Sequence, residues 1–130
     1  MTDIGSYKER GNMAEAIACA WLRKRGYDVF PNMSERGPVD IIAMKDGRVR
    51  KIDVKLVKPT YCPSRSGAAF VGAYGRALRK NQKQLGVEIL YVSHDGFCAF
   101  SRRVMVDHFQ KQLGVPVKDS KRGRPPKLSI

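Results

Sequence analysis

The chain of 130 residues carries 25 lysines and arginines against 12 aspartates and glutamates, which gives a formal net charge of +13. This length suits one domain, and the apolar share of 42% is near that of ordinary globular proteins. No stretch approaches the roughly 18 consecutive apolar residues of a membrane span, and the three cysteines are too far apart for a zinc ribbon. We therefore expect a cytoplasmic protein with no membrane partner, whose basic surface binds a polyanion such as nucleic acid.

Hydrophobic patterning predicts a mixed α/β domain. Residues 8–25 are rich in alanine, lack proline and stop before Gly26, as expected of a helix. The pair Asp46-Gly47 predicts a tight turn between two strands, whereas the glycine, serine and proline content of 60–75 predicts a long loop. In chain order the predicted elements are a helix over 8–25, strands over 27–30, 39–44 and 49–57, a helix over 76–85, strands over 87–92 and 97–100, and a helix over 103–113.

The strand predicted over 49–57 alternates strictly between its two faces. One face carries Val49, Lys51, Asp53 and Lys55, and the other carries Arg50, Ile52, Val54 and Leu56. A period of two places Asp53 and Lys55 about 7 Å apart on the same face. An acid beside a lysine is also a common surface pair, so this pattern alone leaves both interpretations open.

Two further carboxylates lie in otherwise apolar segments. Glu15 is the one charge in the apolar middle of the first predicted helix, and Asp40 follows Gly37-Pro38 and precedes the apolar residues of the next strand. A buried carboxylate needs a cation, a metal or a hydrogen-bond network. The simpler interpretations are a solvent-facing Glu15 and a turn residue at Asp40.

Taken together, these residues indicate a metal site that acts on phosphodiesters. The strands over 39–44 and 49–57 form a hairpin, so Asp40 and Asp53 can lie close together. Mg²⁺ takes a few oxygen ligands and keeps several waters. A carboxylate-held metal neutralises charge at a scissile phosphate and activates a water, and a lysine such as Lys55 can position or deprotonate that water.

These segments resemble the PD-(D/E)XK nuclease superfamily, which includes restriction endonucleases, archaeal-type Holliday-junction resolvases and some homing endonucleases. The matching segments are Gly11-Asn12-Met13-Ala14-Glu15, Gly37-Pro38-Val39-Asp40 and Ile52-Asp53-Val54-Lys55. The resemblance implies an α/β fold with a restriction-endonuclease-like core, a small mixed sheet flanked by helices. It also implies that Mg²⁺, with Mn²⁺ as the alternative, is held by Glu15, Asp40 and Asp53, and that Lys55 acts on the attacking water.

The resemblance departs from the motif at one position and implies one further catalytic residue. Val39 stands between Pro38 and Asp40, where the motif has the proline directly before the acid. The family often adds a polar catalytic residue from the following helix. Here that residue is Gln82, with Asn81 and Gln84 as rival choices.

Two basic segments are candidate DNA contacts. Spacings of three and four place four cations on one stripe of the helix predicted over 76–85: Arg76, Arg79, Lys80 and Lys83. Residues 118–130 are predicted to form a flexible tail, in which five cations against one acid leave +9 of the total charge for the body. Its middle resembles an AT-hook, a motif that enters the minor groove of A·T-rich DNA, at Lys121, Arg122, Gly123, Arg124 and Pro125. A solvated helix face and a generic basic tail are the simpler interpretations.

The sequence thus predicts a nuclease-like domain over 1–117 followed by the tail. The expected function is metal-dependent endonucleolytic cleavage of double-stranded DNA, of homing or restriction type. We expect a homodimer or higher homo-oligomer, because cutting two strands usually needs two sites and one chain offers one. The alternatives are a structure-selective nuclease for branched DNA, similar to Holliday-junction resolvases, a non-catalytic DNA-binding accessory protein, and an RNA-processing nuclease with the same ligands.

Overall fold

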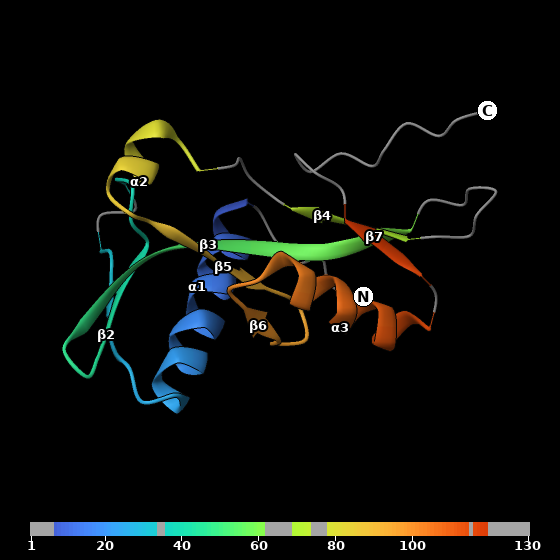
Figure 1. The fold of residues 1–130 in the computed structure, drawn as a ribbon, viewed down its shortest axis with the longest axis horizontal. Coiled ribbons are helices and arrows are strands. Elements are labelled where there is room, and N and C mark those ends of the chain that lie inside the picture. Colours follow the sequence, from blue (N-terminus) through green and yellow to red (C-terminus); the bar gives the residue numbers. More distant parts are fainter. Residues whose placement is uncertain (1–6, 34–35, 62–68, 74–77, 115, 120–130) are drawn as a thin grey trace.

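The computed structural model describes residues 7–33, 36–61, 69–73, 78–114 and 116–119 (Figure 1). Within these ranges, no helix combines the length and hydrophobicity that a membrane crossing requires. In chain order the elements are α1 (Tyr7–Lys24), β1 (Asp28–Pro31), β2 (Ile41–Lys45), β3 (Arg48–Tyr61), β4 (Ala69–Ala73), α2 (Lys80–Gln84), β5 (Glu88–Val92), β6 (Cys98–Ala99), α3 (Arg102–Leu113) and β7 (Val117–Asp119).

The long strand β3 organises a mixed seven-stranded sheet. Its first half pairs antiparallel with β2 and parallel with β5, while β1 and β6 extend the sheet beyond these two neighbours. Its last residues, from Val57 to Tyr61, pair with β4, and β7 lies parallel to β4. Figure 1 shows β3 running along the length of the molecule, so that this one strand joins the two ends of the sheet.

The turn between β2 and β3 sets which side chains share a face. Asp46 and Gly47 both have positive φ angles, 52° and 75°, as a two-residue hairpin turn of type I′ requires. The register that follows pairs Ile41 with Ile52. Because opposite residues of a strand pair point to the same face, Ile52 faces the core and its neighbour Asp53 faces the other side, as the alternation predicted.

The two longer helices cover opposite faces at different ends of the sheet. Under α1 the core contains Ala14, Ala18, Leu22, Ile41, Ala43, Ile52 and Leu90. Under α3 a second cluster contains Val57, Ala99, Met105, Phe109 and Val117. Because α3 packs on the β4–β7 end, the face opposite α1 carries exposed side chains at the β1–β2–β3 end.

The structure confirms the predicted α/β class, a mixed sheet flanked by helices, and corrects three local predictions. Residues 69–73 form β4 rather than loop, because both the preceding strand β3 and the distant strand β7 pair with their backbone. Helix α2 is only five residues long, since Arg79 is extended and the helix begins after it. Lys118 and Asp119 belong to β7 rather than to a tail. Residues 74–77 and 120–130 lie outside the described residues.

Candidate active site

Asp40 is bound to β3 on both sides of Asp53. Its backbone N–H donates to the carbonyl oxygen of Ile52 at 2.9 Å, and its Oδ2 accepts a hydrogen bond from the backbone N–H of Val54 at 2.8 Å. Asp40 therefore lies beside β3, one residue before the first residue of β2, Ile41. This local arrangement brings the carboxyl groups of Asp40 and Asp53 together, as the predicted hairpin required.

Asp53 is almost fully buried, with 9% of its surface exposed. Its Oδ2 lies 2.9 Å from Nζ of Lys55, two residues along the same face of β3. No donor in the described part of the chain makes a well-directed hydrogen bond to this oxygen. The Asp53–Lys55 pair is thus an ion pair whose carboxylate oxygen keeps capacity for a further ligand.

Gln82 connects helix α2 to Asp53 and to the segment that precedes Asp40. Its Nε2 donates to the carbonyl oxygen of Pro38 at 2.9 Å and lies 3.5 Å from Oδ1 of Asp53, while its Oε1 accepts from the backbone N–H of Arg79 at 2.8 Å. Gln82 is 5% exposed, whereas Asn81 and Gln84 are exposed. Of the three polar residues considered from the sequence, Gln82 is the one that contacts Asp53.

The pKa of Asp40 is set first by burial and then by the carboxylates beside it. Burial raises the pKa of Asp40 to about 6, although the hydrogen bond from Val54 acts to lower it. The charge of Asp53, a side-chain hydrogen bond with it, and the charge of Glu15 from α1 also contribute to this raised value. Three carboxylates therefore interact here, and the ammonium group of Lys55 compensates them only in part.

The donor set fits a hydrated divalent cation better than a closed metal cage. Among the described residues, no three histidine, cysteine, aspartate or glutamate side chains converge closely enough to form a preformed metal site. Mg²⁺ needs no such cage, because it is usually bound by one or two carboxylates together with waters and phosphate oxygens. Asp40 and Asp53 are such a pair, and Oδ2 of Asp53 has the ammonium group of Lys55 as its charge partner but no well-directed hydrogen bond in the described part of the chain.

Two polar residues near the site were not singled out from the sequence. Nδ2 of Asn32 donates to the carbonyl oxygen of Val39 at 3.0 Å, and its backbone N–H donates to that of Asp40 at 2.8 Å. Nζ of Lys51 donates to the carbonyl oxygen of Leu85 at 2.8 Å and so links β3 to the end of α2. The alternation of β3 already placed Lys51 on the face of Asp53, but no pattern marked Asn32.

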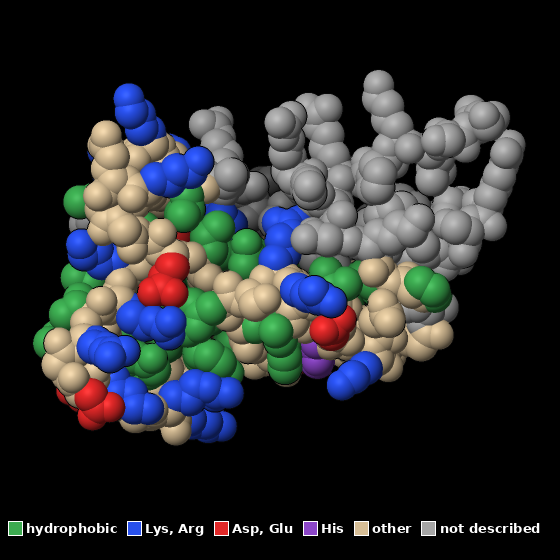
Figure 2. Space-filling model, viewed as in Figure 1, with side chains coloured by type: hydrophobic (Ala, Val, Ile, Leu, Met, Phe, Trp, Pro, Cys, Tyr) green, Lys and Arg blue, Asp and Glu red, His purple; other side chains and the backbone are tan. Residues whose placement is uncertain are grey.

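The predicted DNA contacts are only partly placed. Lys80 and Lys83 are exposed on α2, and Arg79 is exposed just before it. Figure 2 shows lysine and arginine side chains over α2 and over the β2–β3 hairpin below it. Arg76 and the AT-hook-like residues 121–125 lie outside the described residues.

A hollow of about 650 Å³ lies at the hairpin end of the sheet, and neither Asp40 nor Asp53 lines it. Its floor includes Arg50, whose Nε lies 3.1 Å from Oε2 of Glu88 and whose Nη1 is 3.2 Å from the hydroxyl of Tyr27. The guanidinium of Arg50 also lies 4.0 Å from the ring centre of Phe100. Because Arg50 and Glu88 are already paired with each other, we do not consider this hollow a second candidate site beside Asp40 and Asp53.

The fold and the site together define an α/β protein whose mixed sheet places two carboxylates beside a lysine. No family model matches the sequence. A stretch of 50 residues, 37% of the chain, is 38% identical to a protein named UPF0102 protein from Helicobacter hepaticus (strain ATCC 51449 / 3B1), so the chain spans about half (46%) of the curated relative it matches. The solved structure of a bacterial homing endonuclease, I-Ssp6803I, superposes with a TM-score of 0.49 and 18% identity, over 69% of this chain and 59% of that one.

Proposed function

We propose that this chain is a metal-dependent nuclease that hydrolyses phosphodiester bonds in double-stranded DNA. The observation that carries the proposal is the apposition of Asp40 and Asp53, with Lys55 2.9 Å from Asp53, in surroundings that raise the pKa of Asp40 to about 6. Carboxylates that repel one another in a half-buried site are stabilised by a cation bound between them. A lysine at the same site adds a positive group for a phosphate.

Asp40 and Asp53 are the proposed ligands of Mg²⁺, or of Mn²⁺ in its place, with Glu15 as a further carboxylate from α1. When bound there, the metal supplies positive charge to the scissile phosphate and lowers the pKa of a bound water. Gln82 holds α2 and the segment before Asp40 in place around Asp53. This positioning keeps the two ligands together before substrate arrives.

Lys55 is proposed to act on the water and on the phosphate. Its Nζ has three donors and lies 2.9 Å from Oδ2 of Asp53 as an ion pair. Donors that this pair does not use are available to hold the attacking water and to stabilise charge that develops on a non-bridging phosphate oxygen. Lys55 is only partly exposed, with 13% of its side-chain surface accessible, so these interactions are stronger than they would be in bulk water.

DNA as the substrate is supported by charge. The net charge of +13 favours a polyanion, and exposed cations, among them Lys80 and Lys83, lie on α2, whose Gln82 contacts Asp53. We further propose that two copies act together, because one chain offers one carboxylate pair and a duplex has two strands.

The test is a gel assay with Mg²⁺ on supercoiled plasmid, linear duplex and a four-way junction. We expect the wild type to cut and Lys55→Ala to cut at least about 100-fold more slowly, since a positioned proton donor or acceptor contributes about 10²- to 10⁴-fold. Lys111→Ala removes an equal charge from the exposed last turn of α3 and is expected to cut like the wild type. Thermal unfolding of each variant checks that the chain still folds.

Binding measured in EDTA separates catalysis from recognition. We expect Lys55→Ala to bind duplex DNA within about twofold of the wild type, because the exposed cations that meet the phosphates remain. Equal cutting by the wild type and Lys55→Ala would contradict the proposed role of this site. Tight binding without cutting of any substrate would indicate an accessory DNA-binding protein instead.

A further inference from the structure

A group of exposed apolar side chains lies next to the carboxylates on the face opposite α1. The register pairs Phe30 with Ile42 and Met44 with Val49, so these four side chains share one face, which we call the hairpin patch. Phe30 and Val49 are each 53% exposed, and Ile42 and Met44 are 37% and 38% exposed. Contiguous exposed apolar side chains beside a candidate site commonly mark a binding surface.

A hollow joins the hairpin patch to the site. It measures about 300 Å³ and is lined by Phe30, Pro31, Asn32, Val39, Asp40, Ile41 and Ile42. This volume is at the lower end of the range of small-molecule pockets, roughly 300–1,000 Å³. A ligand in this hollow would contact an aromatic ring at one end and approach the proposed metal ligand Asp40 at the other.

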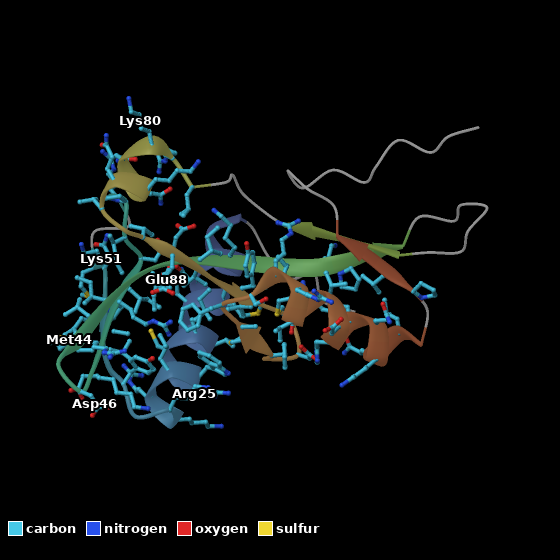
Figure 3. All side chains as sticks on the ribbon, viewed as in Figure 1. Arg25, Met44, Asp46, Lys51, Lys80 and Glu88 are labelled. Atoms are coloured by element: carbon cyan, nitrogen blue, oxygen red, sulfur yellow. The ribbon has the colours of Figure 1, made fainter. Side chains whose placement is uncertain are left out.

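Charged side chains of both signs lie on the same face, where the exposed Asp28 pairs with Met44. Lys51 pairs with Ile42 across the strands and therefore lies on the face of the patch, two residues from Asp53 and thus about 7 Å from it along β3. Figure 3 shows Lys51 and Met44 along the same side of the hairpin, below α2 with Lys80. An exposed aromatic ring, an apolar hollow and neighbouring cations are the combination that receives a nucleotide, with its base stacked and its phosphate paired.

The charge and size of this surface favour a nucleotide over a second protein chain. The hairpin patch has four apolar residues, and Lys51 lies among them. A standard protein interface needs roughly 20–30 residues from each partner, and a cation at its centre would have to be desolvated. A nucleotide needs only one ring-sized contact, and its phosphate is attracted by Lys51.

We propose that the hairpin patch and the hollow beside it hold an unpaired base adjacent to the phosphate at the site, so that this chain prefers DNA with an unstacked nucleotide to fully paired duplex. A base within an intact duplex must first be extruded, at a cost of a few kcal/mol, and this cost is least for a base that is already unpaired. The inference rests on the proposed nuclease function, because a DNA strand whose phosphate is bound beside Lys55 and Lys51 would bring the neighbouring base to the hairpin patch.

The test measures fluorescence anisotropy in EDTA with the full chain and three labelled duplexes. One is fully paired, one contains a single unpaired nucleotide, and one contains the same bulge without its base. We expect the wild type to bind the bulged duplex more tightly than the other two. Phe30→Ala is expected to lose about 5- to 150-fold in affinity for the bulged duplex, the contribution of one base–aromatic stack, and to bind paired duplex as before.

Two further variants serve as controls, one for the aromatic ring of Phe30 and one for its position. Phe30→Tyr keeps an aromatic face and is expected to retain the preference for the bulged duplex. Met33→Ala removes a neighbouring side chain that is 91% exposed and does not line the hollow, and is expected to bind like the wild type.

Equal binding of the three duplexes by the wild type would overturn the inference, as would a Phe30→Ala variant that weakens all three equally. Sedimentation velocity provides another check. If the wild type is a dimer that Phe30→Ala dissociates, the hairpin patch is an interface between copies of the chain and the inference is wrong. A failure of the nuclease proposal is distinguishable, because it appears as absence of cutting in Mg²⁺, whereas base preference is measured without metal.

Discussion

Asp95 and Asp40 differ in how well the rest of the chain satisfies their charge. Asp95 lies in the turn between β5 and β6, where it accepts hydrogen bonds from the hydroxyl of Ser93 and from the backbone N–H of Phe97, and its Oδ2 is 2.7 Å from Nε2 of His108. Burial alone would raise the pKa of Asp95, but the hydrogen bonds from Ser93, His108 and Phe97 outweigh it and hold this pKa below its usual range. The ring of His108 also stacks on Phe97, so this cluster fastens the turn to α3.

At Asp40 the balance is reversed. Burial and the neighbouring carboxylates raise its pKa to about 6, with the hydrogen bond from Val54 acting against them. Within the described ranges, Oδ2 of Asp53 has no well-directed donor. A carboxylate whose charge is balanced by donors and a cation stabilises the folded protein. Carboxylates that lack such partners lower the stability of the folded protein, and their presence therefore suggests a role in function. The direction of the pKa shift, rather than acidity or burial alone, separates the two clusters.

The largest expected difference between the clusters is their response to Mg²⁺. One-site binding at 100 times the dissociation constant stabilises a folded protein by about 2.7 kcal/mol, so we expect the wild type to unfold at a higher temperature in Mg²⁺ than in EDTA. Asp53→Asn is expected to lose this shift and Asp95→Ala to retain it. Because a proton on Asp40 competes with the metal, the shift should also be smaller at pH 5.5 than at pH 8.

Differential scanning fluorimetry with and without Mg²⁺ measures this shift. Ca²⁺ and Na⁺ at matched ionic strength serve as controls for binding by another divalent cation and for screening. A shift of the same size in Asp53→Asn would show that the metal binds elsewhere and would contradict the proposed ligands.

The second prediction concerns the stability of the protein without metal. Asp40→Asn keeps an oxygen acceptor for the backbone N–H of Val54 and removes the repulsion from Asp53 and Glu15. We expect this variant to be more stable than the wild type in EDTA at pH 7.5 by on the order of 1 kcal/mol, after allowance for solvent screening. We expect it to lose cleavage at the same time.

The pH dependence of this gain follows from the raised pKa of Asp40. The folded state binds its proton more readily than the unfolded state, so the penalty is full above pH 6 and fades as the pH falls toward the unfolded value of about 4. Urea unfolding at pH 7.5 and at pH 4.5 should therefore show a large difference between Asp40→Asn and the wild type at the first pH and a small one at the second. A variant less stable than the wild type at both would show that the carboxylate is needed for structure.

Local patterns predicted the parts of this fold that depend on neighbouring residues. The alternation along β3 placed Lys51, Asp53 and Lys55 on one face, and the turn at Asp46-Gly47 placed Asp40 near Asp53. Both follow from strand geometry within one hairpin. The roles of these residues in catalysis stay predictions.

Features that depend on distant partners were not predictable in the same way. Strand β4 lies in a segment, 60–75, whose overall composition is loop-like, and it is a strand because β3 and β7 pair with it. The docking of α2 decides that Gln82, and not Asn81 or Gln84, contacts Asp53, and no periodicity in so short a helix indicates it. Asp95 and His108 meet because α3 packs against the β5–β6 turn, which their sequence spacing does not reveal.

The smallest expected effect concerns the satisfied cluster. Asp95→Ala removes the acceptor for Ser93, Phe97 and His108, and we expect it to lower the free energy of unfolding by about 1 kcal/mol at pH 7, since its charge-assisted hydrogen bonds are partly exposed. The folded pKa of Asp95 lies below its unfolded value, so its contribution is present above pH 4 and is lost as the pH falls through the folded pKa. Urea unfolding at pH 7 and at pH 3 should therefore show a difference from the wild type that shrinks with acid, opposite in sign to that of Asp40→Asn. If the Asp95→Ala variant were instead the more stable protein at pH 7, the contrast between the two clusters would be wrong, because both carboxylates would then be held against repulsion.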